Sequence, residues 1–507
     1  MRNIFCNPQV TIPLAVVTAG ALVFFALGRL GLTPAVSESG PPVAPRSGPA
    51  GSLVYFGPPN SVAVLPFRPG EAADDQAPEA FGLAAAVIRS LGRLPGLQVT
   101  ARTSSFFFQA GSAPPKVIGE RLQAAHLLSG ELRLGGERAI LEAKLYDTRR
   151  GTELWTREFE GAAGDLQPIR DSVVSAVAQT LRVDDVSAPP GSAPIDPEAW
   201  RYFLRGLYYD DQLGGSDPRA AIAAFERALA RQPGYAPAWT GIADAWLSPA
   251  WPESADGPDA GHAMAAVEQA LQADEESAAA LGLLAHIRHR SDRDYPGAAE
   301  AARKAIEIQP NDPGLMGIAS RALFTLGQFE EAESLLQASI RRDPLNLANR
   351  LSLGLLQEFS GEYENALTSY RVLLGLNPEF PGAHACRARV KVIQGKGDSA
   401  LKESEEEIHP FWQDYSRVLA LSALGRDQEA QAVLVRMQEE HARDAAFQLA
   451  ELQAFRGEVD QAFEWLQRAW EQHDPGMGEL KGNFFLNNLH EDPRWKEMLV
   501  KLRLPLD

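Results

Sequence analysis

The sequence predicts a multi-domain protein in three parts: a single transmembrane helix, a small α/β domain and an all-α superhelix of stacked repeats. Three observations predict these parts. A long apolar stretch covers residues 10–32, short alternating strand and helix patterns fill 61–183, and prolines recur 34 residues apart at Pro310, Pro344 and Pro378. At 507 residues the chain exceeds one ordinary core, so several domains are expected.

Composition narrows the classes of partner. The chain has 48 Lys and Arg against 66 Asp and Glu, a net charge of −18. An acidic surface repels phosphate backbones, so direct binding of nucleic acid is not expected. The two cysteines, Cys6 and Cys386, lie in different segments and predict no disulfide framework.

The apolar stretch predicts a membrane anchor. After a short tail at 1–9, residues 10–32 contain one charge, Arg29, and about 20 apolar residues span a bilayer. We expect a signal-anchor helix, hence a single-pass cytoplasmic (inner) membrane protein with its bulk on the extracytoplasmic side. The alternative is a cleaved signal peptide, with small residues near Ala35 at the cleavage site. A linker rich in Pro, Gly and Ser follows at 33–60.

The α/β domain is predicted for 61–183. Ser61–Phe67 is a short apolar run typical of a buried strand, and Ala80–Leu94 has the apolar spacing of a helix. Two later strands, 126–134 and 138–147, flank Gly135-Gly136, a favourable two-residue hairpin turn. The predicted order is strand, helix, strand, helix, three strands, helix.

Three stretches of this domain, SVAVLPF, AFGLAAAVIRSLGRLPGLQVTARTSSFFF and VIGERLQAAHLLSGELRLGGERAILEAKLYDTRRGTELWTREFE, resemble the TolB-amino-terminal-like domain of CadC-type membrane regulators. The resemblance implies no catalytic residues, and it implies that tetratricopeptide repeats follow. CadC-type proteins carry a DNA-binding domain before the membrane helix; only the tail at 1–9 precedes residues 10–32 here, so no such domain is expected. Where the family has an acidic residue before a helix Gly, Phe81-Gly82 stands here.

Arg102–Ser105 and the run Phe106–Phe108 allow two interpretations. Hydroxyl, guanidinium and aromatic groups together suit a ligand loop. The alternative, which we favour, is that the phenylalanines pack against the edge of the sheet.

After a linker at 184–197, residues 198–476 show a repeating pattern. A small residue recurs at Ala298, Ala332 and Ala366, and glycine recurs at turns such as Gly327 and Gly361. Alanine lets two helices approach closely, glycine permits a tight turn, and proline ends the second helix of each unit. A unit of this kind cannot bury its own apolar face and must be stacked.

The pattern resembles the tetratricopeptide repeat, with about seven or eight copies. The best-matched unit, Pro344–Pro378, has Gly354, Tyr363 and Tyr370 at the expected positions. The block at 383–443 departs from the pattern because Gly397 replaces the turn aromatic, so looser helix packing is expected there. Residues 477–507 are predicted to form a carboxyl-terminal capping helix.

Sequence motifs for catalysis are missing. We find no phosphate loop, no Gly-x-Ser-x-Gly turn and no His-Glu-x-x-His helix, so we predict no enzyme, no cofactor and no metal site. His286 and His289 share a helix face, and Glu403 begins an acidic run that continues through 405–407. Both sets suit a cation, yet solvated helix faces are the interpretation we favour.

These observations predict a membrane-anchored, non-catalytic scaffold that binds a protein or peptide in a repeat groove. The resemblance places the groove at Leu351, Leu355, Glu358 and Phe359, although the apolar members could equally pack one repeat against the next. The alternative function is an extracytoplasmic sensor or signalling component coupled to a separate cytoplasmic regulator or enzyme. The identity of the partner and the oligomeric state are left open by the sequence.

Overall fold

The computed structural model describes residues 57–70, 74–183, 195–210, 217–248 and 259–506. The predicted transmembrane helix at 10–32 and most of both linkers lie outside these residues. No helix in the described ranges has the length and apolar character needed to cross a bilayer. The fold class is therefore corrected to an α/β domain followed by an all-α superhelix, and the single-pass inner-membrane localisation that depended on the anchor is wrong on this finding.

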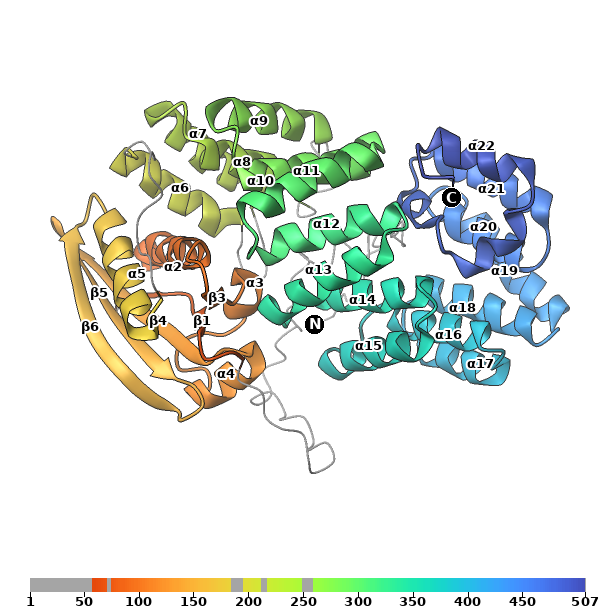
Figure 1. The fold of residues 1–507 in the computed structure, drawn as a ribbon, viewed down its shortest axis with the longest axis horizontal. Coiled ribbons are helices and arrows are strands. Elements are labelled where there is room, and N and C mark those ends of the chain that lie inside the picture. Colours follow the sequence, from red (N-terminus) through yellow and green to blue (C-terminus); the bar gives the residue numbers. More distant parts are fainter. Residues whose placement is uncertain (1–56, 71–73, 184–194, 211–216, 249–258, 507) are drawn as a thin grey trace, which may run out of the picture.

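The α/β domain is built on a six-stranded mixed sheet in the order β3-β1-β4-β5-β6, with β2 paired to β4 (Figure 1). Parallel pairing joins β1 to β3 and β4, and antiparallel pairing joins β4, β5 and β6. The strands are β1 (Ser61–Val64), β2 (Arg68–Pro69), β3 (Gln98–Val99), β4 (His126–Gly135), β5 (Arg138–Asp147) and β6 (Thr152–Ala162).

Strand β1 is buried on both faces, as its continuous apolar run predicts. Val62 and Val64 join the apolar cluster that contains α2 (Ala77–Gly92) and α5 (Gln167–Leu181). Ala63 joins a second cluster with α4 (Pro115–Leu122). Helices therefore cover both sides of the parallel part of the sheet.

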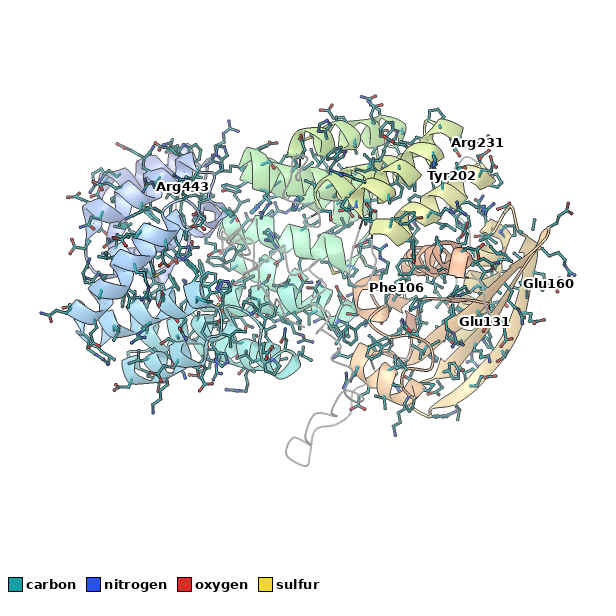
Figure 2. All side chains as sticks on the ribbon, turned by 180° about the vertical axis from the view of Figure 1, so that it is seen from behind. Phe106, Glu131, Glu160, Tyr202, Arg231 and Arg443 are labelled. Carbon is teal, nitrogen blue, oxygen red and sulfur yellow. The ribbon has the colours of Figure 1, made fainter. Side chains whose placement is uncertain are left out.

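The Phe106–Phe108 run separates into three environments. Phe106 is buried against Phe81, with ring centroids 4.7 Å apart, and it lies where the α/β domain meets the repeat helices (Figure 2). Phe108 is buried with α4 on the other side, and Phe107 is 52% exposed. Two of the three rings therefore pack, as the favoured interpretation predicted.

From Pro197 to Glu471 the described chain is an array of eight helix pairs. Figure 1 shows it running from the α/β domain to the carboxyl terminus at the far end. The pairs are α6 (Pro197–Asp210) and α7 (Pro218–Arg231), α8 (Ala236–Trp246) and α9 (Ala260–Ala273), α10 (Ala278–Ile287) and α11 (Tyr295–Ile308), α12 (Pro313–Thr325) and α13 (Phe329–Arg342), α14 (Leu347–Phe359) and α15 (Tyr363–Leu376), α16 (Ala383–Ile393) and α17 (Gly397–Glu406), α18 (Pro410–Ala423) and α19 (Asp427–His441), and α20 (Ala446–Phe455) and α21 (Val459–Glu471).

Glycine and a large ring fit together inside the repeats. A Cβ atom on Gly354 would lie 2.3 Å from the ring of Tyr370, and one on Gly206 would lie 2.2 Å from the ring of Phe225. A large aromatic ring therefore fills the space that glycine leaves in each of these two repeats. In the block expected to pack loosely, Gly397 lies against Leu424, where an added Cβ would be 2.8 Å away. The packing there is close, which corrects the expectation.

The first helices of successive pairs contact one another, from α6 and α8 to α18 and α20, and Phe324 of α12 packs on Phe359 of α14. Helices crowd on the shorter side of a curved stack, so this row is the inner, concave side. We call it the inner row.

The carboxyl-terminal region differs from the predicted capping helix. Only α22 (Pro493–Lys501) is α-helical, preceded by the 3₁₀ turns η3 (Pro475–Glu479) and η4 (Phe484–Leu489). We call residues 474–489 the C-terminal segment. This segment does not form an α-helix, because Pro475 and the glycines 476, 478 and 482 disfavour continuous α-helical hydrogen bonding.

Candidate functional site

The four predicted groove residues lie on α14, and all four are buried. Leu351 and Leu355 belong to the apolar cluster shared by α14 to α20, and Phe359 packs on Phe324 with centroids 5.0 Å apart. Contact between repeats accounts for these three side chains, which is the alternative left open by the sequence. Glu358 is different, since it is a carboxylate only 4% exposed.

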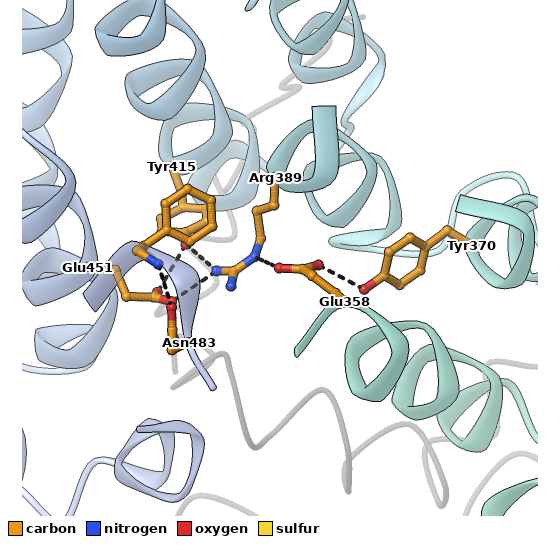
Figure 3. Close-up of polar contacts among 7 residues, drawn as sticks. Glu358, Tyr370, Arg389, Tyr415, Glu451 and Asn483 are labelled. Carbon is orange, nitrogen blue, oxygen red and sulfur yellow. Dashed lines mark hydrogen bonds and ion pairs between the residues drawn. The ribbon is translucent and has the colours of Figure 1, made fainter. Parts of the chain in front are cut away.

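Glu358 belongs to a buried polar network that crosses the inner row (Figure 3). Arg389 on α16 donates from Nε to Glu358 Oε1 at 2.8 Å and from Nη1 to Glu451 Oε1 at 3.0 Å. Tyr415 on α18 donates its hydroxyl to Glu451 Oε2 at 3.0 Å, and Tyr370 donates to Glu358 Oε2 at 3.1 Å. One arginine thus holds two carboxylates from helices α14 and α20.

Burial and charge act against each other in this network. Burial raises the pKa of Glu358, and the positive charge of Arg389 opposes that rise. The pKa of Arg389 lies well above its ordinary value because Glu358 and Glu451 outweigh the burial of its guanidinium. Burial raises the pKa of the neighbouring Cys386 thiol, so this cysteine is no activated nucleophile. The network has a structural role, because each oxygen of the Glu358 and Glu451 carboxylates already accepts a hydrogen bond.

The C-terminal segment closes this network from the concave side. Asn483 donates from Nδ2 to Glu451 Oε1 at 2.8 Å, and the ring of Phe485 lies 4.7 Å from the Arg389 guanidinium carbon. Phe485 also packs on Phe455, with centroids 5.3 Å apart. Close approach depends on Gly482, where a Cβ would lie 2.7 Å from Phe329. The inner row therefore already holds one segment of chain, built of 3₁₀ turns, by amide, cation–π and aromatic contacts.

A second junction joins the α/β domain to the repeats. Asp343, between α13 and α14, accepts hydrogen bonds from Thr103 Oγ1 at 2.8 Å and Ser104 Oγ at 2.5 Å. Ser104 Oγ also accepts from the Leu345 backbone N–H at 3.0 Å. The hydroxyls of α3 (Arg102–Ser105), singled out by the sequence as a possible ligand loop, thus hold an internal carboxylate.

The α/β domain contacts the first repeat as well. Gly82 of α2 lies against α6, where an added Cβ would be 2.5 Å from the Leu204 Cβ. Glu79 is buried and binds Arg205 at 2.8 Å and Arg201 at 3.2 Å, both from α6. This ion triad borders a cavity of about 650 Å³ between the β4–β5 turn and α6. Together with the Asp343 junction, these contacts attach the α/β domain to the array at two points, one on α6 and one between α13 and α14.

The polar groups considered for metal binding have protein partners. Glu403 binds His384 at 2.9 Å and Lys391 at 2.6 Å, and Glu407 accepts from the backbone N–H groups that begin α16, including Gly382 at 3.1 Å. His289 contacts Thr325 Oγ1 at 2.9 Å. Across the described ranges, no three His, Cys, Asp or Glu side chains are grouped closely enough to hold a metal ion.

Stacked helix pairs with an inner row define a helical-repeat protein. Its repeats match the tetratricopeptide-repeat family at residues 210–248 and 289–353. These ranges cover α7 and α8 and then the region from η2 (Arg288–Asp292) into α14. The chain therefore carries tetratricopeptide repeats, as the sequence predicted.

Comparison with individual proteins adds partial matches. A curated relative named Putative adenylate cyclase 3, from Rhizobium meliloti (strain 1021), is 26% identical over 182 residues. The match covers 35% of this chain and 31% of the relative, so the chain spans about a third of that protein's length.

Similar solved structures include PilW, a type IV pilus biogenesis factor, at 21% identity and a TM-score of 0.33, covering 36% of this chain and 86% of that one. PilF of Pseudomonas aeruginosa is 17% identical with a TM-score of 0.35, covering 44% and 99%. YrrB, a TPR protein with an unusual peptide-binding site, is 16% identical with a TM-score of 0.31, covering 42% and 97%.

Proposed function

We propose that this chain is a non-catalytic scaffold that binds an extended segment of a protein partner along its inner row. The supporting observation is the C-terminal segment, which occupies the inner row as a peptide ligand would. Its contacts use Asn483 against Glu451 and Phe485 against Arg389. A backbone segment held by a few anchoring side chains is a common mode of peptide recognition.

The C-terminal segment competes with such a partner for the same surface. If the segment leaves the inner row only part of the time, the apparent affinity falls by the fraction of time that the surface is open. Loosening the segment should therefore strengthen partner binding. Asn483→Asp is suited to this purpose because it removes the donor to Glu451 and places a second carboxylate beside it, while its acceptor for the Phe485 N–H is kept.

The experiment uses the full chain. Peptides selected from a displayed random library on the wild-type protein are measured by fluorescence anisotropy against wild type, Asn483→Asp and Asn487→Asp. Asn487 is exposed on η4, the 3₁₀ turn that Asn483 caps, so it controls for the added charge. We expect affinity to rise about 10-fold in Asn483→Asp only, which corresponds to about 1.4 kcal/mol of lost competition. Equal affinities for all three proteins would remove the inner row as the binding surface.

A further inference from the structure

The cavity of about 650 Å³ between the α/β domain and the first repeat has the size of a ligand site. The start of α2 and the 3₁₀ turn η1 (Asp74–Gln76) form one wall, and α6 forms another. The β4–β5 turn and the turn between β6 and α5 complete it. Small-molecule sites occupy about 300–1,000 Å³, so this volume admits a whole small ligand. Its charged lining residues are Asp75, Glu79, Glu137, Arg201 and Arg205.

Hydrogen bonds hold the walls of this cavity together. Strand β2 ends at Pro69, and further along β4 the side chain of Gln76 takes over its pairing. Gln76 Nε2 donates to the Leu134 carbonyl at 3.1 Å, and the Leu134 N–H donates to Gln76 Oε1 at 3.0 Å. The Ala163 N–H donates to the Glu137 carbonyl at 2.9 Å, which joins the two turns. The cavity is therefore pre-formed by the chain's own contacts, which reduces the ordering that binding requires.

Two guanidinium groups on α6 share a single carboxylate oxygen at the cavity. Arg205 Nη2 lies 2.8 Å from Glu79 Oε1, and Arg201 Nη2 lies 3.2 Å from the same atom. The Glu79 side chain is 2% exposed, whereas those of Arg201 and Arg205 are 34% and 37% exposed. Within the described ranges, neither arginine has a hydrogen-bond partner at Nη1. One negative charge thus faces two positive ones, and α6 presents free N–H donors.

The opposite charge comes from Asp75 on η1 and Glu137 in the β4–β5 turn. Both residues are exposed, and neither carboxylate has a hydrogen bond or an ion pair with any residue that the structure describes. The two signs of charge therefore come from different walls of the cavity. A simple anion drawn to the arginines would meet unpaired carboxylates nearby, and a simple cation would meet the arginines.

We propose that this cavity binds a small zwitterion, an amino acid or a short peptide, with its carboxylate on the arginines of α6 and its ammonium group on the free carboxylates. Guanidinium groups bind a carboxylate through paired N–H donors, and an ammonium group offers three donors to carboxylate oxygens. A ligand that carries both charges satisfies both walls. It would also join the α/β domain to the first repeat. This inference does not rest on the scaffold role proposed above.

The first experiment measures binding to the full chain by calorimetry and by the midpoint of thermal unfolding. The probes are the standard amino acids, one at a time, and trialanine, so that a single amino acid is distinguished from a short peptide. The tightest binder is then compared with its N-acetyl form, which lacks the ammonium group, and with its C-terminal amide, which lacks the carboxylate. We expect one site and a higher melting temperature with the zwitterion, and affinities lower by about 10-fold or more for both modified forms.

Variants of the acidic wall test the ammonium contact. The double variant Asp75→Asn, Glu137→Gln removes two carboxylates without protein partners, so it should melt at the wild-type temperature when no probe is added. It should bind the zwitterion and its N-acetyl form with about equal affinity. The charge-matched control is Glu120→Gln, Glu405→Gln, at exposed positions on α4 and α17. The control should keep the wild-type preference for the zwitterion.

A variant of α6 tests the carboxylate contact. In Arg205→Gln, Glu79 keeps its ion pair with Arg201, and the affinity for the zwitterion should fall by about 10-fold, toward that of the amide. Arg371→Gln, exposed on α15, is the matched control and should bind as wild type does.

Three outcomes would overturn the proposal. The first is that no amino acid binds to the wild-type protein and trialanine does not bind either. The second is that the N-acetyl form or the amide binds as tightly as the zwitterion. The third is that the acidic double variant and Arg205→Gln both keep wild-type affinity, which would place the zwitterion elsewhere on the chain.

Discussion

Replacing Arg389 by methionine tests the buried network most directly. Methionine keeps most of the side-chain volume and removes the donors that Arg389 directs at Glu358 and Glu451. Both carboxylates are buried, with exposed fractions of 4% and 1%. Both carboxylates would then be buried without a counter-charge. This lowers the free energy of unfolding far more than replacing all the charged groups of the network together would.

The expected loss can be worked from two directions. Removing one partner of a buried ion pair costs about 3–5 kcal/mol. A buried carboxyl that protonates instead costs about 4 kcal/mol at pH 7, given an ordinary pKa near 4.3 and about 1.4 kcal/mol per pH unit. The two figures agree. In the variant the folded carboxyls have a pKa above the unfolded value, so the loss is largest at high pH and shrinks as pH falls toward 4.3.

The assay follows urea unfolding and amide hydrogen exchange at pH 7.5 and pH 5, because repeat arrays open in segments and one probe is insufficient. We expect the free energy of opening of α14 to α20, measured by hydrogen exchange, to fall by about 3–5 kcal/mol at pH 7.5 and by less than half of that at pH 5. The triple variant Glu358→Gln, Arg389→Met, Glu451→Gln should recover most of the loss. A loss below about 1 kcal/mol, or one that is equal at both pH values, would refute the reasoning.

Three further predictions concern packing, pH and domain attachment. Gly354→Ala should destabilise the protein by about 1–3 kcal/mol in urea, since its Cβ meets Tyr370, whereas Gly375→Ala, with open space around it, should be neutral or stabilising. Glu479 has a folded pKa raised to about 8, so its contribution to stability falls from pH 5 to pH 8, and Glu479→Gln should flatten that part of the melting profile; an unchanged slope would contradict this. Asp343→Ala should speed hydrogen exchange in α3 while α20 stays protected, because it removes the acceptor for Ser104; exchange at wild-type rates would count against the junction.

Local pattern was enough to predict the helix pairs. Gly354 and Tyr370 stand at positions expected for the repeat, and in the structure the Tyr370 ring fills the space beside Gly354, 16 residues away. Contacts between helices that are neighbours in the chain recur at fixed spacings, so the sequence alone can indicate them. Gly397 misled the prediction because a missing aromatic was taken for loose packing. Leu424, from the next repeat, fills that space.

The predicted groove residues show where local pattern is not enough. Glu358 matched a position that faces the inner row, yet the structure buries it against Arg389, 31 residues away. Nothing local marks that pairing. Thr103 and Ser104 attracted attention as polar residues beside aromatic ones, but their partner Asp343 is about 240 residues away.

By itself the sequence determined the order of elements in the α/β domain, the period of the repeats, and the absence of recognisable catalytic motifs. These follow from short-range propensity, turn chemistry and the spacing of small and large residues. Only the tertiary structure decided which faces stay open. It placed the C-terminal segment on the inner row, attached the α/β domain at Asp343 and Glu79, and brought Arg205 and Glu137 to one cavity. Each of these contacts joins residues far apart in the chain, so local sequence pattern does not report it. Burial, charge and shape determine which of these contacts form only when the helices pack together.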